Sequence, residues 1–399
     1  MKLKKYFPSV TIIYIQLLIL CAYPYVFRQF LPIPTLSILY GLCLFVNICL
    51  LYLSKCDAHV GIPNAFRTLC YVQGAFYLFG FFYHSDSSYL FRIFYLLLTY
   101  TILLLLVKKN NLRKFIIFNN KFITVQAVLG FVAFILIFLN ILQPLFTFEN
   151  MDSRLSTCYG LTCGKGILNI QRICGYFDEP GSLAFWGIYA LILNKLYVKD
   201  KKIELLLIIG LTSTLSMAYF IQLGLYLLAF YTKRKYIKYL IGFSLLIGGL
   251  MAYVYYIEGV DSELFRLTFG RFGMGDYDLD NNREDLMELA EKMFRQAPLL
   301  GNGETYISTL DYMGDNPFET LAVDGIMGTV MIYLPLIVLA FSRSYSSSDI
   351  KKAILILCVG YLQRPFHFQI LHFVMLYLFV LYAYQRKYEN TQSYSDYSM

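Results

Sequence analysis

Charged residues are scarce in this chain. They make up 15% of its 399 residues, against roughly 25% in a typical soluble domain, while 58% of the residues are hydrophobic. Tyrosine (36) and phenylalanine (34) are abundant, as is typical where rings line bilayer interfaces or packed helices. The composition excludes a soluble globular domain. It predicts an all-α, polytopic integral membrane protein that forms one unit over residues 1–399.

Metal-binding motifs and a cleavable leader are missing as well. The four histidines show no metal-ligand spacing, and no CxxC or HExxH motif occurs, so we expect no metal and no cofactor. An apolar run over about 10–26 follows Lys2, Lys4 and Lys5. This run is too long for a signal peptide, and no small-x-small cleavage site follows it. We therefore expect a first helix that is retained.

The cysteines fall into two groups. Most lie in apolar segments, where packing is the default role of cysteine. Cys158 and Cys163 differ because they share a polar loop. If that loop is extracytoplasmic the two can form a disulfide, since disulfides persist in oxidising compartments, and otherwise we expect two thiols.

Long apolar runs fill most of the chain. A membrane-spanning helix needs about 20 apolar residues. Candidates cover about 9–27, 35–54, 67–83, 89–107, 122–147, 182–198, 239–257 and 320–342. Two further stretches, 204–232 and 353–384, are each long for one helix and short for two. If each is a pair of short helices, the chain has about twelve crossings.

The basic residues decide between these interpretations. With twelve crossings and both termini in the cytoplasm, most of the 34 Lys and Arg residues lie in cytoplasmic segments near helix ends. A single helix over 204–232 would move the basic cluster at 233–238 outside, against the positive-inside rule. The net charge of +8 therefore orients the protein, and we expect no nucleic-acid partner. Two long polar loops, about 148–181 and 258–319, then face away from the cytoplasm.

Each paired stretch contains a predicted break. Ser213, Thr214 and Ser216 interrupt the first stretch, and Arg364 followed by Pro365 interrupts the second. Proline cannot donate a helical hydrogen bond, and non-helical backbone at membrane depth is tolerated only where it is buried or lines a cavity. We expect both breaks to line a cavity that opens outward. Arg364 is a functional candidate because ionisable residues at membrane depth usually serve function.

Arginine is prominent in the two outer loops, whereas the cytoplasmic side is rich in lysine. The basic residues of the loops include Arg154, Lys165, Arg172, Arg266, Arg271, Arg283, Lys292 and Arg295. Because a guanidinium binds phosphate through two parallel hydrogen bonds, the loops predict an anionic, lipid-linked substrate such as one that carries a diphosphate. Ion pairing with the acidic residues of the same loops is the alternative interpretation.

The larger loop contains a predicted amphipathic helix. Asn282 is placed to cap it, and apolar residues follow on one face from Leu286 to Phe294. Pro298 ends the helix, and the Gly-Asn-Gly sequence at 301–303 predicts a turn. Such a helix can lie on the outer leaflet, cover a cavity or pack against neighbouring helices.

Three segments resemble motifs of the O-antigen polymerase and ligase superfamily. The segment 172–181 (RICGYFDEPG) is similar to the family's R-x-x-G-x-F-x-E/N-P segment. The segment 211–216 (LTSTLS) is similar to a T-x-S helix end, although Met217 stands where the family usually has arginine. The longest match comprises Arg283, 297–303 (APLLGNG), 315–321 (DNPFETL) and 324–328 (DGIMG).

This resemblance covers about 170–330 and implies a membrane glycosyltransferase of GT-C-like architecture. Proteins of the family join oligosaccharides carried on undecaprenyl diphosphate at the outer face of the bacterial inner membrane. Ligases of the family have histidine before the motif asparagine, and here that position is Asp315, which favours a polymerase. An O-antigen ligase and a flippase for lipid-linked sugars are the alternatives, although the chain shows no clear internal repeat of the kind that transporters carry.

The resemblance also implies roles for individual residues. A leaving diphosphate needs cations, and the candidates are Arg172, Arg283 and Arg364, followed by Arg266 and Arg271. The attacking hydroxyl needs a base, for which the candidates are Glu179, then Asp315 and Asp178. Asp178 and Glu179 can instead complement the dipole of the helix that starts near Pro180.

Asn316 either holds a sugar hydroxyl or caps the helix that follows it. The resemblance further implies metal-independent chemistry, because neither a nucleotide-sugar motif nor a metal-binding acidic pair is evident in the chain. The expected partners are the undecaprenyl-diphosphate-linked oligosaccharide, membrane lipid, a chain-length regulator and a flippase.

Overall fold

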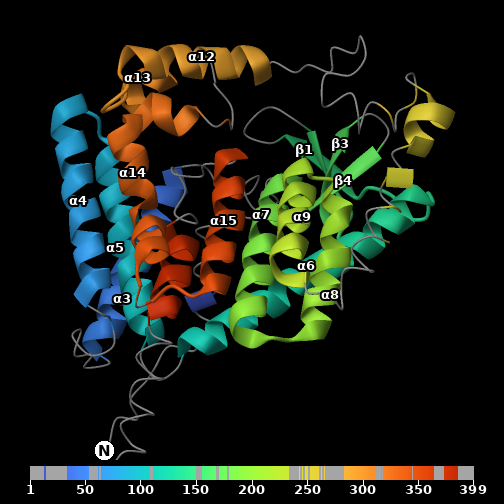
Figure 1. The fold of residues 1–399 in the computed structure, drawn as a ribbon, viewed down its shortest axis with the longest axis horizontal. Coiled ribbons are helices and arrows are strands. Elements are labelled where there is room, and N and C mark those ends of the chain that lie inside the picture. The colour runs from blue at the N-terminus through green and yellow to red at the C-terminus, as the bar shows by residue number, and fades with distance from the viewer. Residues whose placement is uncertain are drawn as a thin grey trace, which may run out of the picture.

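The computed structural model describes most of the chain. It covers residues 34–53, 64–107, 111–149, 155–167, 170–177, 179–232, 252–259, 283–310, 318–343, 345–363 and 373–384, and the positions 13–14, 62, 242, 245, 248–249, 262, 265 and 316. The described chain is mostly helical, with one small sheet at one end of the helices (Figure 1).

The helices form three groups along the chain. The first is α3 (Pro34–Leu53), α4 (Asn64–His84), α5 (Ser88–Val107) and α6 (Asn111–Phe138). The second is α7 (Pro180–Leu193), its π-helical continuation η2 (Asn194–Val198), α8 (Lys201–Gly210), the 3-10 turn η3 (Leu211–Thr214) and α9 (Met217–Tyr231). The third is η4 (Val254–Glu258), α12 (Arg283–Gln296), α13 (Glu304–Ser308), α14 (Glu319–Phe341), α15 (Ser348–Gln363) and a helix at Phe373–Tyr384.

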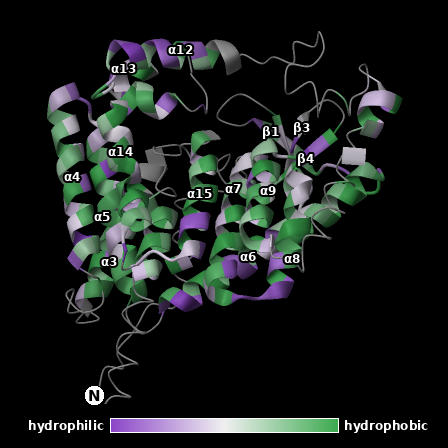
Figure 2. Ribbon diagram, in the orientation of Figure 1, coloured by the Kyte–Doolittle hydropathy of each residue, from purple (hydrophilic) through white to green (hydrophobic). Residues whose placement is uncertain are grey.

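Four of the described helices are long and apolar enough to cross a membrane. They are α5, α6, α7 continued to Val198, and α14. Hydrophobic residues run along the helices in Figure 2. Large apolar side chains also project outward, among them Phe82 and Phe138, which are 71% and 74% exposed. Such surfaces suit a lipid environment rather than water, so the chain has the features of a multi-pass membrane protein.

The prediction of about twelve crossings is wrong for the described part of the chain, where four helices meet the length and hydropathy that a span requires. The physical reason is helix length. The two helices of the first paired stretch, α8 and α9, have 10 and 15 residues, whereas a full span needs about 20. Shorter apolar helical segments also lie within α3, at Tyr40–Tyr52, and at Phe373–Tyr384.

The predicted break in the stretch 204–232 is confirmed. The helix α8 ends in the turn η3, Leu215 takes a left-handed conformation (φ 46°), and α9 begins at Met217. The hydroxyls of Ser213 and Thr214 donate to carbonyls three residues back, at 2.8 and 2.7 Å. Hydroxyl groups that bond their own helix in this way favour a bend or an end. The predicted break at Arg364 and Pro365 lies outside the described residues.

A four-stranded antiparallel sheet corrects the all-α prediction. Its strands are β1 (Phe146–Glu149), β2 (Leu155–Cys158), β3 (Cys163–Ile167) and β4 (Ile170–Gly175), in that order. The strands are four to six residues long, and β3 is the glycine-rich CGKGI. Segments so short and polar carry little alternation of the kind that identifies a strand, which explains why the sequence indicated a loop.

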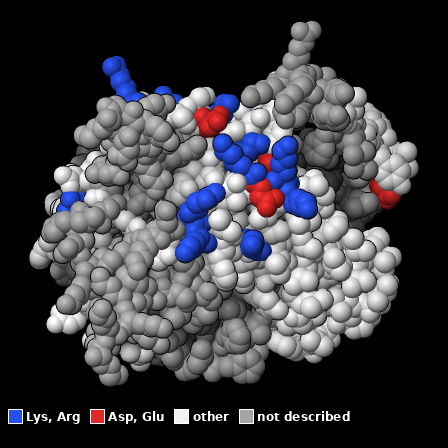
Figure 3. All heavy atoms as spheres, turned by 90° about the horizontal axis from the view of Figure 1, so that it is seen from below, with Lys and Arg blue, Asp and Glu red and all other residues white. Residues whose placement is uncertain are grey.

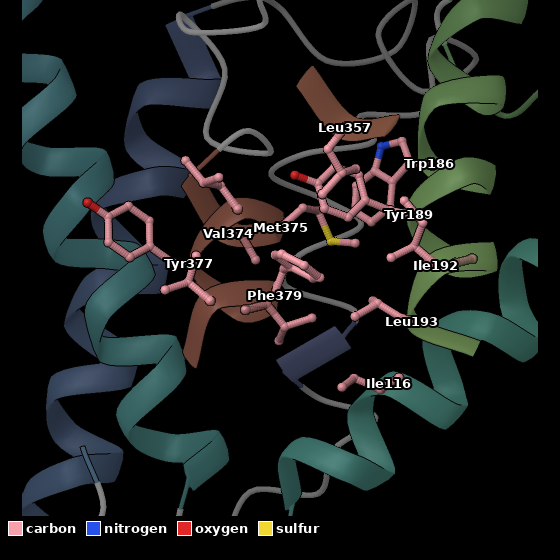
Figure 4. Packing of buried hydrophobic residues seen from close by; sticks show 14 of the residues in the cluster. Ile116, Trp186, Tyr189, Ile192, Leu193, Leu357, Val374, Met375, Tyr377 and Phe379 are labelled. Carbon is pink, nitrogen blue, oxygen red and sulfur yellow. The ribbon is translucent and has the colours of Figure 1, made fainter. Parts of the chain in front are cut away.

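Buried contacts hold α7 at the centre of the molecule. All of its residues are buried, as expected for a helix that is hydrophobic on every side. It packs against α6, α9 and α15. In Figure 4, Trp186, Tyr189, Ile192 and Leu193 of α7 face side chains that include Leu357, Met375 and Phe379. The start of α7 is therefore held in place by its neighbours, and strand β4 of the sheet packs against this helix.

The two ends of the helices differ in charge. One end carries exposed basic residues in or near the connections between α5 and α6, α7 and α8, and α14 and α15, namely Arg113, Lys114, Lys199, Lys201, Lys202, Arg343 and Lys351. Figure 3 shows Lys and Arg side chains gathered on this face. The sheet, α12 and α13 lie at the opposite end (Figure 1). The predicted orientation, with lysine-rich segments in the cytoplasm, requires this distribution.

Candidate functional site

The structure describes the side chains of three of the predicted site residues: Arg172, Glu179 and Asn316. Arg283 is the first residue of α12, and its backbone alone is described. The other predicted site residues lie outside the described residues: Asp178, Arg266, Arg271, Asp315 and Arg364. The site is therefore built from the first three and from the residues that the fold brings to them.

Three charged side chains meet where the sheet touches the start of α7, and we name them the cationic corner: Lys165, Arg172 and Glu179. Lys165 on β3 and Arg172 on β4 are direct cross-strand partners. The Nζ atom of Lys165 lies 3.7 Å from Oε1 of Glu179, and Nε of Arg172 donates to the carbonyl of Thr214 at 3.2 Å. The corner thus joins the sheet, the first helical turn of α7 and the break between α8 and α9.

The local sequence explains the place of Glu179. Pro180 starts α7, because its fixed φ suits the first helical position and its missing N–H is not needed there. Glu179 is the residue just before it, in an extended conformation, and its side chain accepts no capping hydrogen bond. The carboxylate reaches Lys165 instead. The helix dipole still favours a negative charge here, so the expected dipole role and the ion pair coexist.

Lys165 and Arg172 form an unfavourable pair by themselves. Like charges directly opposite each other on neighbouring strands destabilise a sheet. Lys165 is also mostly buried, with 9% of its side chain exposed, while Glu179 is 22% exposed. An anion that bound between the two cations would relieve this repulsion. Sequence reasoning named Lys165 as a loop residue but gave it no role, because only the strand register brings it opposite Arg172.

A second group of charges, which we name the Arg92 cluster, joins α5 to α13 and α14. Nη1 of Arg92 lies 2.5 Å from Oδ1 of Asp324, and Nη2 lies 3.3 Å from Oε2 of Glu304. The hydroxyl of Tyr89 donates to the same oxygen of Asp324 at 3.0 Å. Burial raises the pKa of Glu304 above its usual value, and Arg92 opposes this shift. The cluster ties an outer helix to two apolar helices.

Sequence reasoning gave Arg92 no role and treated Asp324 only as part of a motif. A signal was present, since each is a charged residue inside an otherwise apolar stretch. Such residues are costly in a membrane unless they are paired or functional. Their pairing could not be read from the sequence because 232 positions separate them.

Two segments of the longest motif match, 297–303 and 324–328, lie against each other in the structure. The backbone of 298–303 pairs with that of 322–327 through four hydrogen bonds, such as Gly303 N to Val323 O at 2.9 Å and Ile326 N to Pro298 O at 2.9 Å. Gly325 has φ 64°, and a Cβ atom there would lie 2.5 Å from the nitrogen of Gly301. Glycine is needed because a side chain would block this approach.

Two polar side chains fix the segments around this contact. Oδ1 of Asn316 accepts from the backbone N–H of Phe318 at 2.9 Å, in the turn that leads into α14. The N-cap of α14 is Phe318, without a side-chain capping hydrogen bond, so the expected capping role of Asn316 stays a prediction. Asp86, between α4 and α5, accepts from the backbone N–H and the hydroxyl of Thr305 at 2.7 and 2.6 Å. Burial raises the pKa of Asp86, but hydrogen bonds from Thr305 and Ser88 outweigh it and lower that pKa to about 2.

The two outer loops were both expected to contact an anionic, lipid-linked substrate, which would require them to lie close together. In the structure, the sheet packs on α6 and α7, whereas α12 packs on α14. Both lie at the same end of the helices (Figure 1). A joint site of the cationic corner and the Arg92 cluster stays a prediction.

Comparison with known proteins does not decide the family. No protein-family model matches the chain, and no curated protein or solved structure matches it either. The resemblance of the three motifs therefore stays a hypothesis. The geometry of the cationic corner and of the motif contact carries the functional argument.

Proposed function

We propose that this protein is a polymerase of a bacterial surface polysaccharide, either O-antigen or capsule. It transfers the growing glycan from undecaprenyl diphosphate onto a new lipid-linked repeat unit at the outer face of the inner membrane. The observation that carries the proposal is the cationic corner, where Lys165 and Arg172 face each other beside the carboxylate of Glu179. This proposal keeps the predicted orientation, with both termini in the cytoplasm.

The corner supplies what the transfer requires. A departing diphosphate gains negative charge, and preorganised cations stabilise that charge without any proton transfer. Arg172 is held in place by its hydrogen bond to Thr214 O, and Lys165 by its pairing with Glu179. We assign both cations to the diphosphate. Arg283 and Arg364 are further candidates from the motif resemblance, followed by Arg266 and Arg271.

The proposed step is a displacement that inverts the anomeric centre. A hydroxyl oxygen of the acceptor repeat forms a bond to the anomeric carbon of the donor glycan. The bond between that carbon and the diphosphate oxygen breaks, and its electron pair leaves with the diphosphate. The hydroxyl proton passes to a carboxylate base, for which Glu179 is the first candidate because it lies beside the two cations. Asp178 and Asp315 are the other candidates, and no metal is required.

Glycan analysis after deletion of the gene tests the proposal. Loss of a polymerase leaves single repeat units on the final acceptor. Loss of a ligase instead accumulates lipid-linked polymer, and loss of a flippase leaves repeat units facing the cytoplasm. Either of these two patterns would overturn the polymerase assignment. A chain-length regulator and a flippase are the expected partners, and their loss would give other patterns.

Variants of the arginines test the site within that experiment. Arg172→Lys and Arg283→Lys each keep a positive charge but lose the planar fork that binds phosphate with two hydrogen bonds. We expect both variants to abolish long chains while the protein is still expressed. The matched control is Arg295→Lys, because Arg295 is an exposed residue of α12 that pairs with Glu291. Normal chain lengths from both test variants would contradict the role of these arginines.

A further inference from the structure

Three cysteines form a buried cluster in the sheet. Cys158, Cys163 and Cys174 are 4%, 2% and 1% exposed, and they pack with Phe148 and Tyr176. Cys158 ends β2, Cys163 begins β3, and Cys174 lies near the end of β4. Within the part of the chain that the structure describes, no group of three potential ligands is placed to hold a metal ion. We therefore consider disulfide formation within this cluster.

The strand register singles out two of the three cysteines. Cys158 and Cys163 are direct cross-strand partners in the hairpin of β2 and β3. Next to them, Tyr159 N donates to Thr162 O at 2.9 Å, which makes 159 and 162 the hydrogen-bonded pair that closes the turn. In an antiparallel ladder hydrogen-bonded and non-hydrogen-bonded pairs alternate, so Cys158 and Cys163 form a non-hydrogen-bonded pair.

The pair has the separation that a disulfide needs. Cα atoms of a non-hydrogen-bonded pair are about 4.5 Å apart, and disulfides bridge Cα atoms about 4.4–6.8 Å apart. Cys174 has a different position. Cys163 pairs with Gly175, and the register shifts between Cys163 and Gly164. Cys174 therefore lies at the irregularity and is not directly opposite Cys163.

We propose that Cys158 and Cys163 form a regulatory or structural disulfide at the tip of this hairpin, with Cys174 remaining a thiol. Both are thiols in the structure. The two thiols lose two protons and two electrons as the S–S bond forms. The co-reactant is a protein disulfide of an extracytoplasmic thiol oxidase, which is reduced to its dithiol by thiol–disulfide exchange. The proposal rests on the outward placement of the sheet, which is part of the proposed function.

The bond would act on the cationic corner. Lys165 lies two residues after Cys163 on β3, and its position opposite Arg172 depends on the strand register. A slip of one residue would turn Lys165 to the other face of the sheet. A covalent link between β2 and the start of β3 opposes a slip of β3 relative to β2, and β3 is the strand that presents Lys165 to β4. The disulfide would therefore hold one of the two cations in place.

A thiol-trapping experiment tests the proposal on the full chain. Cells are lysed directly in denaturant with an excess of N-ethylmaleimide, so that every free thiol is blocked, and the protein is then purified and treated with reductant. Newly exposed thiols are then tagged with a polyethylene-glycol maleimide and counted by gel shift. We expect two tags on the wild-type chain, none on Cys158→Ser or Cys163→Ser, and two on Cys174→Ser. The last variant also shows whether a serine in this cluster allows the protein to fold.

Each outcome has one meaning. Absence of tags on the wild-type chain would overturn the proposal, because both cysteines would then have been thiols in the cell. Two tags on Cys158→Ser or on Cys163→Ser would also overturn it, since another cysteine would be the partner. The count does not depend on glycan synthesis. A failed polymerase assignment therefore appears in the glycan pattern, and a failed disulfide assignment appears in the number of tags.

Discussion

The cationic corner and the Arg92 cluster are both groups of charges at the same end of the helices, but they differ in the balance of positive and negative charge. In the Arg92 cluster one guanidinium meets two carboxylates, and the side chains of Arg92 and Asp324 are 2% and 0% exposed. In the corner two cations meet one carboxylate among the described side chains, and Glu179 is 22% exposed. Each group has one partly exposed carboxylate, Glu304 at 33% and Glu179 at 22%, so the two groups differ in the sign of their excess charge rather than in exposure.

The difference in charge balance indicates a structural role for the Arg92 cluster and fits the proposed binding role of the cationic corner. A buried charge without its partner is strongly destabilising, so the Arg92 cluster holds α5, α13 and α14 in one arrangement. Cations that face each other across two strands weaken a sheet, and the proposed function places an anionic ligand beside Lys165 and Arg172. Variants of the Arg92 cluster should therefore lower stability more than activity, whereas variants of the cationic corner should lower activity more than stability.

The largest loss of stability is expected at the Arg92 cluster. Arg92→Leu leaves Asp324 buried without its cation, which should lower the free energy of unfolding by about 3–5 kcal/mol. Thermal unfolding of the purified protein in detergent measures this loss by circular dichroism. The control is Arg295→Leu in an exposed ion pair, where we expect at most about 1 kcal/mol. Equal losses from both variants would contradict the structural role of the cluster.

A smaller loss is expected where the motif contact brings two backbones together. Gly325→Ala places a Cβ atom 2.5 Å from Gly301 N at a positive φ. Strain of this kind costs about 1–3 kcal/mol. Gly224→Ala in α9 is the matched control, because nothing lies within 4 Å of a Cβ atom there, and alanine is the better helix former. The same unfolding measurement should show destabilisation for the first variant only.

A pH-dependent effect is expected at Asp86, which ties the turn after α4 to α13. Hydrogen bonds lower the pKa of Asp86 to about 2 in the folded protein, below the value of roughly 3.9 of an unfolded chain. The carboxylate therefore stabilises the fold above about pH 4, and this contribution is lost as the pH falls through 2. We expect the difference in unfolding temperature between the wild type and Asp86→Asn to shrink as the pH falls from 5 to 2.

The matched control for this prediction is Asp349→Asn. Asp349 is an exposed residue near the other end of the helices, and its side chain is 62% exposed. This variant measures how the loss of one exposed carboxylate changes the unfolding temperature at each pH. A difference for Asp86→Asn that stays constant from pH 5 to pH 2 would show that the hydrogen bonds to Thr305 do not stabilise the ionised form.

Local patterns predicted a large part of this fold. The apolar lengths of α5 and α14, the break at 211–216 and the amphipathic α12 all follow from residues that are close together in the sequence. The polar segment that became the sheet was not predicted, because its strands are short and depend on partners rather than on their own propensity. The sequence therefore indicated long helices better than short strands.

The candidate site could be predicted only in part. Arg172 and Glu179 were found through a motif, and the structure connects them through Lys165. That connection depends on strand register, which sequence spacing does not reveal. The partners of Arg92 were missed for a similar reason, because Glu304 lies 212 positions away. Pairings over such distances are set by helix packing and not by a local pattern.

The most direct test of the account is whether the cationic corner binds diphosphate. Affinity of the purified full chain for undecaprenyl diphosphate is measured with Lys165→Gln, Arg172→Gln and the control Arg295→Gln. Each corner variant should lose about 10-fold to 100-fold in affinity, because a hydrogen bond to a charged group contributes roughly 1.5–3 kcal/mol. Unchanged affinity in both corner variants would contradict the account.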